Sequence, residues 1–216
     1  MTEINVSAHT EYHTQRNNVL VPLTSCNTTS AVMWLLDCGV PFDCPPGMQP
    51  EDYLTSVTER SETYAKMREL APWAFRGERA AYPPREVHVM LAWAVNEMVG
   101  REVMRFREDA TYQELAAELA RGKAALLSTV LTQRGHVVCL VGVRTRQERG
   151  GLGEAGTVRL DQIEGWVVDD PFGDYWTCYN DQHGNDVFFP FDDFTRLTKE
   201  LYRNHKWAHL FVGDVV

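Results

Sequence analysis

The chain has 216 residues, of which 44% are apolar, and this length suits one large domain with a substantial core. Its 21 Lys and Arg against 30 Asp and Glu give a net charge of −9. That charge argues against nucleic-acid binding and against electrostatic capture of an anionic polymer. No apolar run is long enough to span a membrane, and the polar N-terminus has no signal-peptide core. We expect a single domain over 1–216, made in the cytoplasm.

The first half of the chain is predicted to be mainly helical. A dense apolar segment from Cys26 to Leu36, stopped by Gly39, predicts a short buried helix. Proline at a first helical position and acids in the first turn both favour helix starts, and glycine favours helix ends. These signals, together with a capping box formed by Thr111 and Glu114, predict three further helices, over 50–70, over 84–99 and from Thr111 to Gly122.

The residue pattern changes after Lys123, where short β-branched runs alternate with glycine and polar turns. Strands are predicted over 125–131, 136–143, 165–170, 187–191 and 207–216, with a helical turn over 192–197. The glycine-rich segment 144–156 is expected to be an exposed loop between two antiparallel strands. Helices leading and strands following predict an α+β fold, with a helical part at about 25–122 and a sheet part at about 123–216.

Four residues have contexts that favour nucleophilic catalysis. Cys26 lies at the start of the buried helix, where unpaired amide N–H groups and the helix dipole favour a thiolate. His136 begins one strand and Asp170 ends the next, so the carboxylate can fix the tautomer of the ring while the other ring nitrogen faces the thiol. Gln15 lies upstream and can donate an amide N–H to an oxyanion.

Each feature alone also fits a structural role, since buried cysteines and Asp-Pro turns are common. The acids between Asp169 and Asp186 do not have the spacing of an EF-hand loop, and the chain has no Cys-x-x-Cys pair for zinc. We expect no metal and no cofactor. Cys38 and Cys44 flank a proline-rich loop, and a reducing compartment favours them as free thiols.

The ordered segments QRNN (15–18), CNTTSAVMWLL (26–36), GHVVCLVGV (135–143) and DDPFGDYW (169–176) resemble papain-like cysteine peptidases of the bacteriocin-processing, double-glycine-peptidase-like kind. The resemblance implies a papain-like fold, in which the nucleophile helix packs on an antiparallel sheet. It also implies that Cys26 is the nucleophile, His136 the general base and acid, Asp170 its orienting partner and Gln15 the oxyanion donor.

The chain departs from that family at several positions. Asn27 and Thr28 follow the cysteine, where the family often has Gly-Pro, and Gln15 precedes Cys26 by more residues than in papain. Asn17 or Asn18 is an alternative oxyanion donor. Asp169 competes with Asp170 for the orienting role, because neighbouring residues of a strand face opposite sides.

The resemblance implies a cysteine peptidase or amidase that hydrolyses peptide bonds. We expect its substrate to be the peptide part of bacterial peptidoglycan, as for a bacteriophage endolysin released on host lysis. We expect a monomer that binds no nucleic acid and has no membrane span. The alternatives are a protein- or leader-processing protease, an acyl transferase like the transglutaminases or arylamine acetyltransferases, and a non-catalytic binding module.

Overall fold

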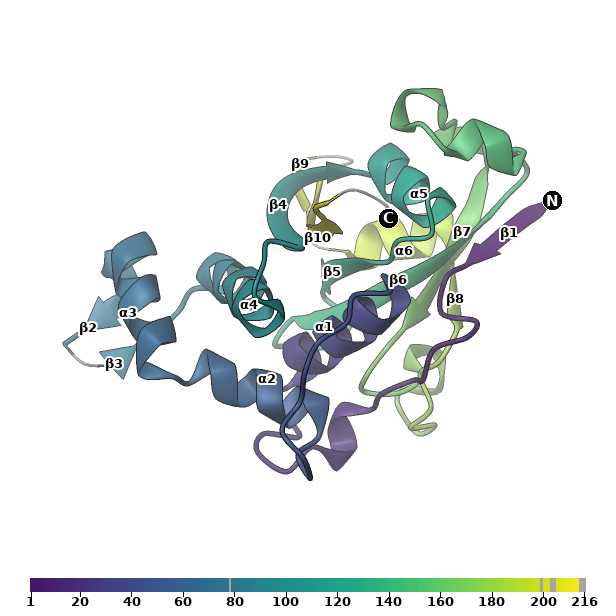
Figure 1. Ribbon diagram of the computed structural model, residues 1–216. Helices are drawn as coiled ribbons and strands as arrows, with labels where there is room; N and C mark the ends of the chain where they lie inside the picture. The colour runs from purple at the N-terminus through teal and green to yellow at the C-terminus, as the bar shows by residue number, and fades with distance from the viewer. Residues whose placement is uncertain (78, 199, 203–204, 214–216) are drawn as a thin grey trace.

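The fold is built on an antiparallel sheet, which has eight strands within the described residues, 1–77, 79–198, 200–202 and 205–213 of the computed structural model (Figure 1). The strands are β1 (Thr2–Asn5), β4 (Met104–Thr111), β5 (Ala125–Thr129), β6 (His136–Thr145), β7 (Ile163–Asp169), β8 (Val187–Pro190), β9 (Glu200–Tyr202) and β10 (His205–Phe211). Their order is β4-β10-β5-β6-β7-β8, with β1 beside β6 and β9 beside β10. A separate two-stranded sheet pairs β2 (Phe75–Arg76) with β3 (Arg79–Ala80).

Helices cover both faces of the large sheet. The helices of the chain are α1 (Cys26–Asp37), α2 (Pro50–Thr58), α3 (Ser61–Leu70), α4 (Pro84–Val99), α5 (Tyr112–Ala120) and α6 (Phe191–Leu197). Helix α3 packs against α2 and α4, away from the sheet (Figure 1). One apolar cluster joins α1, α2 and α4 to the sheet, and a second joins α5 and α6 to the opposite face. The chain is therefore α+β, with the sheet as the middle layer.

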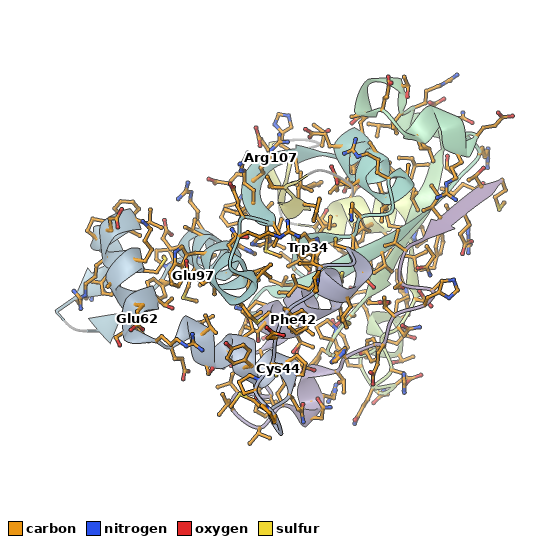
Figure 2. The ribbon with its side chains drawn as sticks, in the orientation of Figure 1. Trp34, Phe42, Cys44, Glu62, Glu97 and Arg107 are labelled. Atoms are coloured by element: carbon orange, nitrogen blue, oxygen red, sulfur yellow. The ribbon has the colours of Figure 1, made fainter. Side chains whose placement is uncertain are left out.

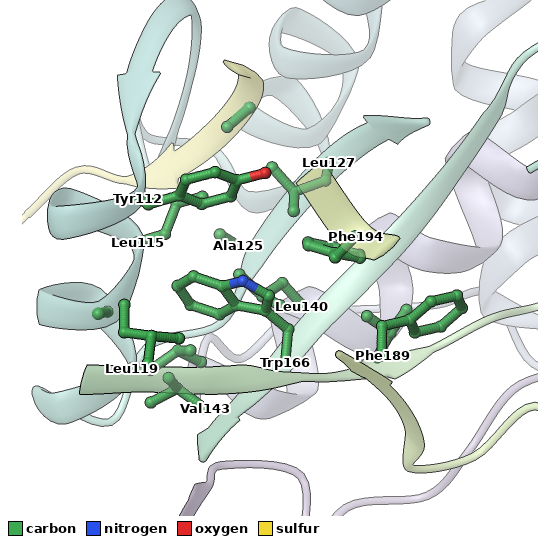
Figure 3. Packing of buried hydrophobic residues seen from close by; sticks show 14 of the residues in the cluster. Tyr112, Leu115, Leu119, Ala125, Leu127, Leu140, Val143, Trp166, Phe189 and Phe194 are labelled. Atoms are coloured by element: carbon green, nitrogen blue, oxygen red, sulfur yellow. The ribbon is translucent and has the colours of Figure 1, made fainter. Parts of the chain in front are cut away.

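Successive side chains of the central strands point to opposite faces of the sheet, and this alternation creates the two clusters. In β5, Ala125 and Leu127 belong to the cluster under α5, whereas Leu126 belongs to the cluster under α1. Figure 3 shows the cluster under α5 and α6, where the ring of Trp166 stacks on Tyr112 at 5.3 Å between centroids. Because both faces of the central strands are buried, their sequences are almost continuously apolar.

Trp34 fixes α1 on the other face. It is fully buried near the centre of the molecule (Figure 2), and its indole N–H donates to the carbonyl of Ala124 at 2.8 Å. This bond satisfies the one polar atom of a side chain that is otherwise held by packing. The helix that begins at Cys26 is thereby held against the start of β5.

Several predicted elements are confirmed. The helix over 84–99 has the predicted bounds and ends at Gly100 with φ 76°, and the capping box of Thr111 and Glu114 opens α5. The helical turn near 192–197 is α6. The strands predicted after Lys123 all form within the described residues. The predicted last strand, 207–216, falls partly outside them, at 214–216.

The single helix predicted over 50–70 is wrong, because the chain forms α2 and α3 with a break at Glu59 and Arg60. Hydroxyl groups account for the break. Ser56 and Thr58 donate to carbonyls three residues earlier, which competes with the helical pattern, and buried Thr63 caps the carbonyl of Val57. The apolar periodicity continues across the break and hides it.

The division of the chain into a helical part and a sheet part also differs from the prediction. Strand β1 and strand β4, both from the N-terminal half, belong to the sheet. In β4 the apolar residues Met104, Phe106 and Ala110 alternate with charged ones, as suits an edge strand. The loop predicted at 144–156 contains short 3₁₀ turns, and its Leu152 is fully buried against the α5 side of the sheet.

Across the part of the chain that the structure describes, no helix has both the length and the apolar character needed to cross a bilayer.

Gly142 allows β1, β6 and β7 to approach one another closely. A Cβ at this position would lie 2.6 Å from the carbonyl oxygen of Ile4 and 2.9 Å from Cβ of Val167. We expect Gly142→Ala to lower the free energy of unfolding by about 1–3 kcal/mol, as overpacking of a core does. Urea unfolding measures this, with Gly150→Ala as the control, because nothing lies within 4 Å of a Cβ there. Equal stabilities for the two variants would contradict the prediction.

Candidate active site

Three of the four predicted site residues converge where α1 meets the sheet. Cys26 is the first residue of α1, His136 is the first residue of β6, and Asp170 directly follows β7. The pairing of β6 with β7 stops at Cys139 and Asp169. Beyond that point the two strands leave room for the N-terminal end of α1.

His136 is held between the other two side chains. Its Nε2 lies 2.6 Å from Oδ1 of Asp170, and its side chain also forms a hydrogen bond with Cys26. Because Nε2 is taken by the carboxylate, Nδ1 is the nitrogen left for the thiol. The imidazole is 5% exposed and Asp170 is fully buried, so this pair is shielded from water.

Val137 joins the helix to the strand at this point. Its carbonyl accepts a hydrogen bond from the hydroxyl of Ser30 at 2.9 Å, and its backbone N–H donates to the Cys26 sulfur. The position of the sulfur is therefore fixed by main-chain groups of β6 as well as by α1. The first-turn amides of a helix have no partner within the helix and favour a negative charge close to them.

The pKa values of the two groups move in opposite directions. Burial alone raises the pKa of the Cys26 thiol, but the hydrogen bond and positive charge of His136, with the N–H of Val137, outweigh it and lower the pKa. Burial alone lowers the pKa of His136, but the hydrogen bonds to Asp170 and Cys26 outweigh it and raise the pKa to about 10. Both shifts favour the charged forms, the thiolate of Cys26 and the imidazolium of His136.

The Asp170 carboxylate is held by its own loop. Oδ1 also accepts the backbone N–H of Phe172 at 2.8 Å, and the hydroxyl of Tyr179 lies 3.4 Å from Oδ2. The Tyr12 hydroxyl donates to the Asp170 carbonyl and accepts from the N–H of Gly184. A Cβ at Gly184 would lie 2.1 Å from that carbonyl oxygen. Sequence analysis did not identify Tyr12, Tyr179 or Gly184, which carry no motif signal of their own.

Asp169, the alternative orienting residue, faces the other way. Its Oδ1 accepts the backbone N–H of Asp186 at 2.7 Å, and burial raises its pKa to about 7. Asp37 lies nearby, and burial raises its pKa to about 6 although the hydroxyl of Thr10 donates to it. These carboxyl groups belong to a buried acidic cluster, whereas His136 pairs with Asp170.

Of the three proposed oxyanion donors, Gln15 is placed at the site. It lines a cavity with Cys26 and His136, and its Nε2 donates to the carbonyl of Pro22 at 2.9 Å, which uses one of two N–H groups. Asn18 donates to Ser25 and Thr29 inside the protein, so both of its N–H groups are engaged. Asn17 is exposed and does not line either cavity beside the thiol.

Backbone bonds fix the segment that carries Gln15. The N–H of Gln15 donates to the carbonyl of Pro171 at 2.9 Å, and Arg16 lies over the Phe172 ring at 4.0 Å. Phe172 in turn presents its ring roughly edge-on to His136. The N-terminal segment and the loop after β7 are thus joined beside the imidazole.

Two cavities, of about 400 and 450 Å³, flank the Cys26–His136 pair. Both are lined by Thr24, Cys26, Arg134, Gly135 and His136. The first continues toward α4, and the second toward Gln15 and Phe172. A chain laid across the thiol has space on both sides, which is the arrangement needed to hold an internal bond of a polymer. Arg134 was not predicted; its position in the turn before His136 is the signal that identifies it.

No group of three or more His, Cys, Asp or Glu side chains is arranged to hold a metal ion anywhere in the described part of the chain. The five cysteines are free thiols, Cys38 and Cys44 included. Comparison with known protein families, with curated proteins and with solved structures gives no match. The chemistry is therefore argued from the geometry of the site.

The lowered pKa predicts how Cys26 reacts. We expect iodoacetamide to alkylate Cys26 fastest of the five cysteines at pH 7, with the rate falling only as the pH drops through the lowered pKa. His136→Ala removes the stabilising cation and should slow the reaction at pH 7 by roughly tenfold or more, because an ordinary thiol is only a few per cent ionised there. Mass spectrometry of each cysteine measures the rates. Exposed Cys178 is the internal control and should keep its rate, whereas faster labelling of buried Cys38 and Cys139 would point to unfolding instead.

The raised pKa of Asp169 predicts a pH-dependent stability. A carboxyl with a raised pKa binds its proton more tightly in the folded protein, so its contribution to stability falls as the pH rises from about 4 toward 7. Asp169→Asn removes the charge and should raise the free energy of unfolding at pH 8 by roughly 1–4 kcal/mol, and by little at pH 4. Urea unfolding at both pH values tests this, with exposed Asp43→Asn as the control. A loss of stability at pH 8 would contradict it.

Proposed function

We propose that the protein is a cysteine peptidase or amidase that hydrolyses peptide bonds with Cys26, His136 and Asp170. The observation that carries the proposal is the hydrogen-bonded series of thiol, imidazole and carboxylate at a helix N-terminus, with a cavity on each side of the thiol. A purely structural cysteine would have no use for a lowered pKa or for two open cavities. A buried imidazole with a raised pKa beside it is equally characteristic of catalysis.

In the first half of the reaction the Cys26 thiolate attacks the carbonyl carbon of the scissile bond, and a carbon–sulfur bond forms. The imidazolium of His136 then gives its Nδ1 proton to the leaving nitrogen as the carbon–nitrogen bond breaks. The amine product departs and a thioester remains on Cys26. His136 is now neutral and can act as a base.

In the second half a water molecule attacks the thioester carbonyl while His136 takes one of its protons. The carbon–sulfur bond breaks, the carboxylic acid product leaves, and the thiolate–imidazolium pair is restored. Asp170 keeps Nε2 of His136 engaged throughout, so that Nδ1 always faces the sulfur. It positions the imidazole and does not itself transfer a proton.

Gln15 is the proposed donor to the oxyanion that develops in both steps. Support comes from its place in the cavity beside Cys26 and from the second N–H of its Nε2, which the bond to Pro22 leaves over. The first-turn amides of α1 are the other donors in reach of that oxygen. Gln15 is 2% exposed and fixed by the loop after β7, so the donor needs no rearrangement when charge develops.

We further propose a papain-like architecture and, as substrate, the peptide part of bacterial peptidoglycan, with the protein acting as an endolysin released on host lysis. The packing of α1 on an antiparallel sheet and the chain order Cys, His, Asp support the architecture. The substrate follows from the resemblance of the four segments that carry the site residues.

The experiment is to incubate the protein with purified peptidoglycan and to count newly formed amino groups with an amine-reactive label. We expect hydrolysis by the wild type and a loss of about a thousandfold or more in Cys26→Ala, because the nucleophile carries the reaction. Cys44→Ala, which removes a thiol outside both cavities, is the matched control.

Three results would revise or overturn the proposal. Turnover that rises with an added amine and yields an amide would assign acyl transfer in place of hydrolysis. Release of peptides from unfolded protein substrates with intact peptidoglycan would retain the mechanism and replace the substrate. Equal activity of wild type and Cys26→Ala would remove Cys26 from the chemistry.

A further inference from the structure

The turn that joins β5 to β6 places a cation beside the thiol. In this turn the hydroxyl of Thr132 donates to the carbonyl of Gly135 at 2.7 Å, and the N–H of Gly135 donates back to the carbonyl of Thr132 at 3.1 Å. Gly135 has φ 83°, a conformation that favours glycine. This closed turn fixes Arg134 two residues before His136, at the rim shared by both cavities.

Arg134 has no ion-pair, hydrogen-bond or ring partner within residues 1–77, 79–198, 200–202 and 205–213, and it is exposed. Many of the other arginines have such partners. Arg85, Arg107 and Arg144, for example, each pair with a glutamate. Arg134 therefore keeps its full hydrogen-bonding capacity for a ligand. A guanidinium binds carboxylates through two parallel N–H donors.

The surroundings of Arg134 also select for negative charge. The protein carries a net charge of −9, yet among the described residues that line the two cavities there is neither Asp nor Glu. The lining is neutral apart from Arg134, Cys26 and the histidines. In a chain that has 30 Asp and Glu, Arg134 therefore has no carboxylate partner among the described residues of this lining.

The position of Arg134 relative to Cys26 limits where the charge on the substrate must lie. Arg134 lines both cavities, as Cys26 does, so it belongs to the wall that the two cavities share. A carboxylate bound by it belongs to a residue next to the scissile carbonyl. The walls farther out include exposed Leu23 and Val130, which suit apolar groups.

We infer that Arg134 is a specificity-determining residue that binds a carboxylate of the substrate, and that the substrate is an anionic peptide with this carboxylate adjacent to the bond that is cleaved. The inference rests on the proposed function, since it uses the same thiol as its reference point. Beyond the proposed function, it states that the substrate is negatively charged and that Arg134 recognises this charge.

The test compares iodoacetate with iodoacetamide, two alkylating agents of similar size that differ in charge. We expect Arg134→Gln to lower the ratio of the iodoacetate rate to the iodoacetamide rate at Cys26 by about three- to fivefold at low salt, and by less at high salt. Arg134→Lys keeps the charge and should keep most of the ratio. Arg149→Gln is the matched control, because this exposed arginine lies on the α5 side of the sheet.

A second measurement uses a peptide library in which Glu or Gln occupies each position around a common sequence. Cleavage products of the wild type should be enriched in Glu beside the cleaved bond, and Arg134→Gln should lose this enrichment. A ratio that Arg134→Gln leaves unchanged, or cleavage indifferent to Glu, would overturn the inference while the mechanism stands. Failure of iodoacetamide itself to prefer Cys26 would instead overturn the proposed function.

Discussion

The buried imidazole of His136 is the constraint around which the site is organised. A protonated ring removed from water is costly unless an anion and a second hydrogen-bond partner are supplied. Asp170 and Cys26 supply them on opposite sides of the ring, and both stabilise its protonated form. The loss of either partner would leave a buried charge without compensation.

The need to fix those partners explains the structure around them. Asp170 is held from four sides by Tyr12, Phe172, Tyr179 and Gly184, so that its carboxylate stays aligned with the ring. The sulfur is held by Val137 and the start of α1. The pairing of β7 with β6 ends at Asp169, opposite Cys139. If it continued to Val137, the backbone groups of Val137 would bond to β7 and would not be available to contact α1. The position of the Cys26 thiol therefore depends on the early end of the β6–β7 pairing.

Local signals in the sequence were sufficient to predict the helix and strands that carry the site residues. A helix start at Cys26, a glycine before His136 and an Asp-Pro after the next strand are determined within a few residues, and the structure brings these residues together as predicted. The choice between Gln15 and Asn18 depends on contacts with Pro22, Ser25 and Thr29, which no spacing rule encodes. The break after α2 and the recruitment of β4 to the sheet depend on hydroxyl groups and edge pairing that override local patterns. The place of Arg134 just before His136 can be read from the sequence, but the lack of Asp and Glu among the described residues that line the cavities exists only in three dimensions.

The distribution of the five thiols has a consequence for oxidation. A partly exposed thiolate is the form of cysteine that peroxides oxidise to a sulfenic acid, so Cys26 is the most vulnerable of the five. Burial raises the pKa of Cys38 and Cys139 and keeps both of them unreactive. Among the described residues that line the cavities, Cys26 has no second cysteine with which to close a disulfide. Recovery of an oxidised Cys26 therefore requires an external thiol small enough to enter the cleft.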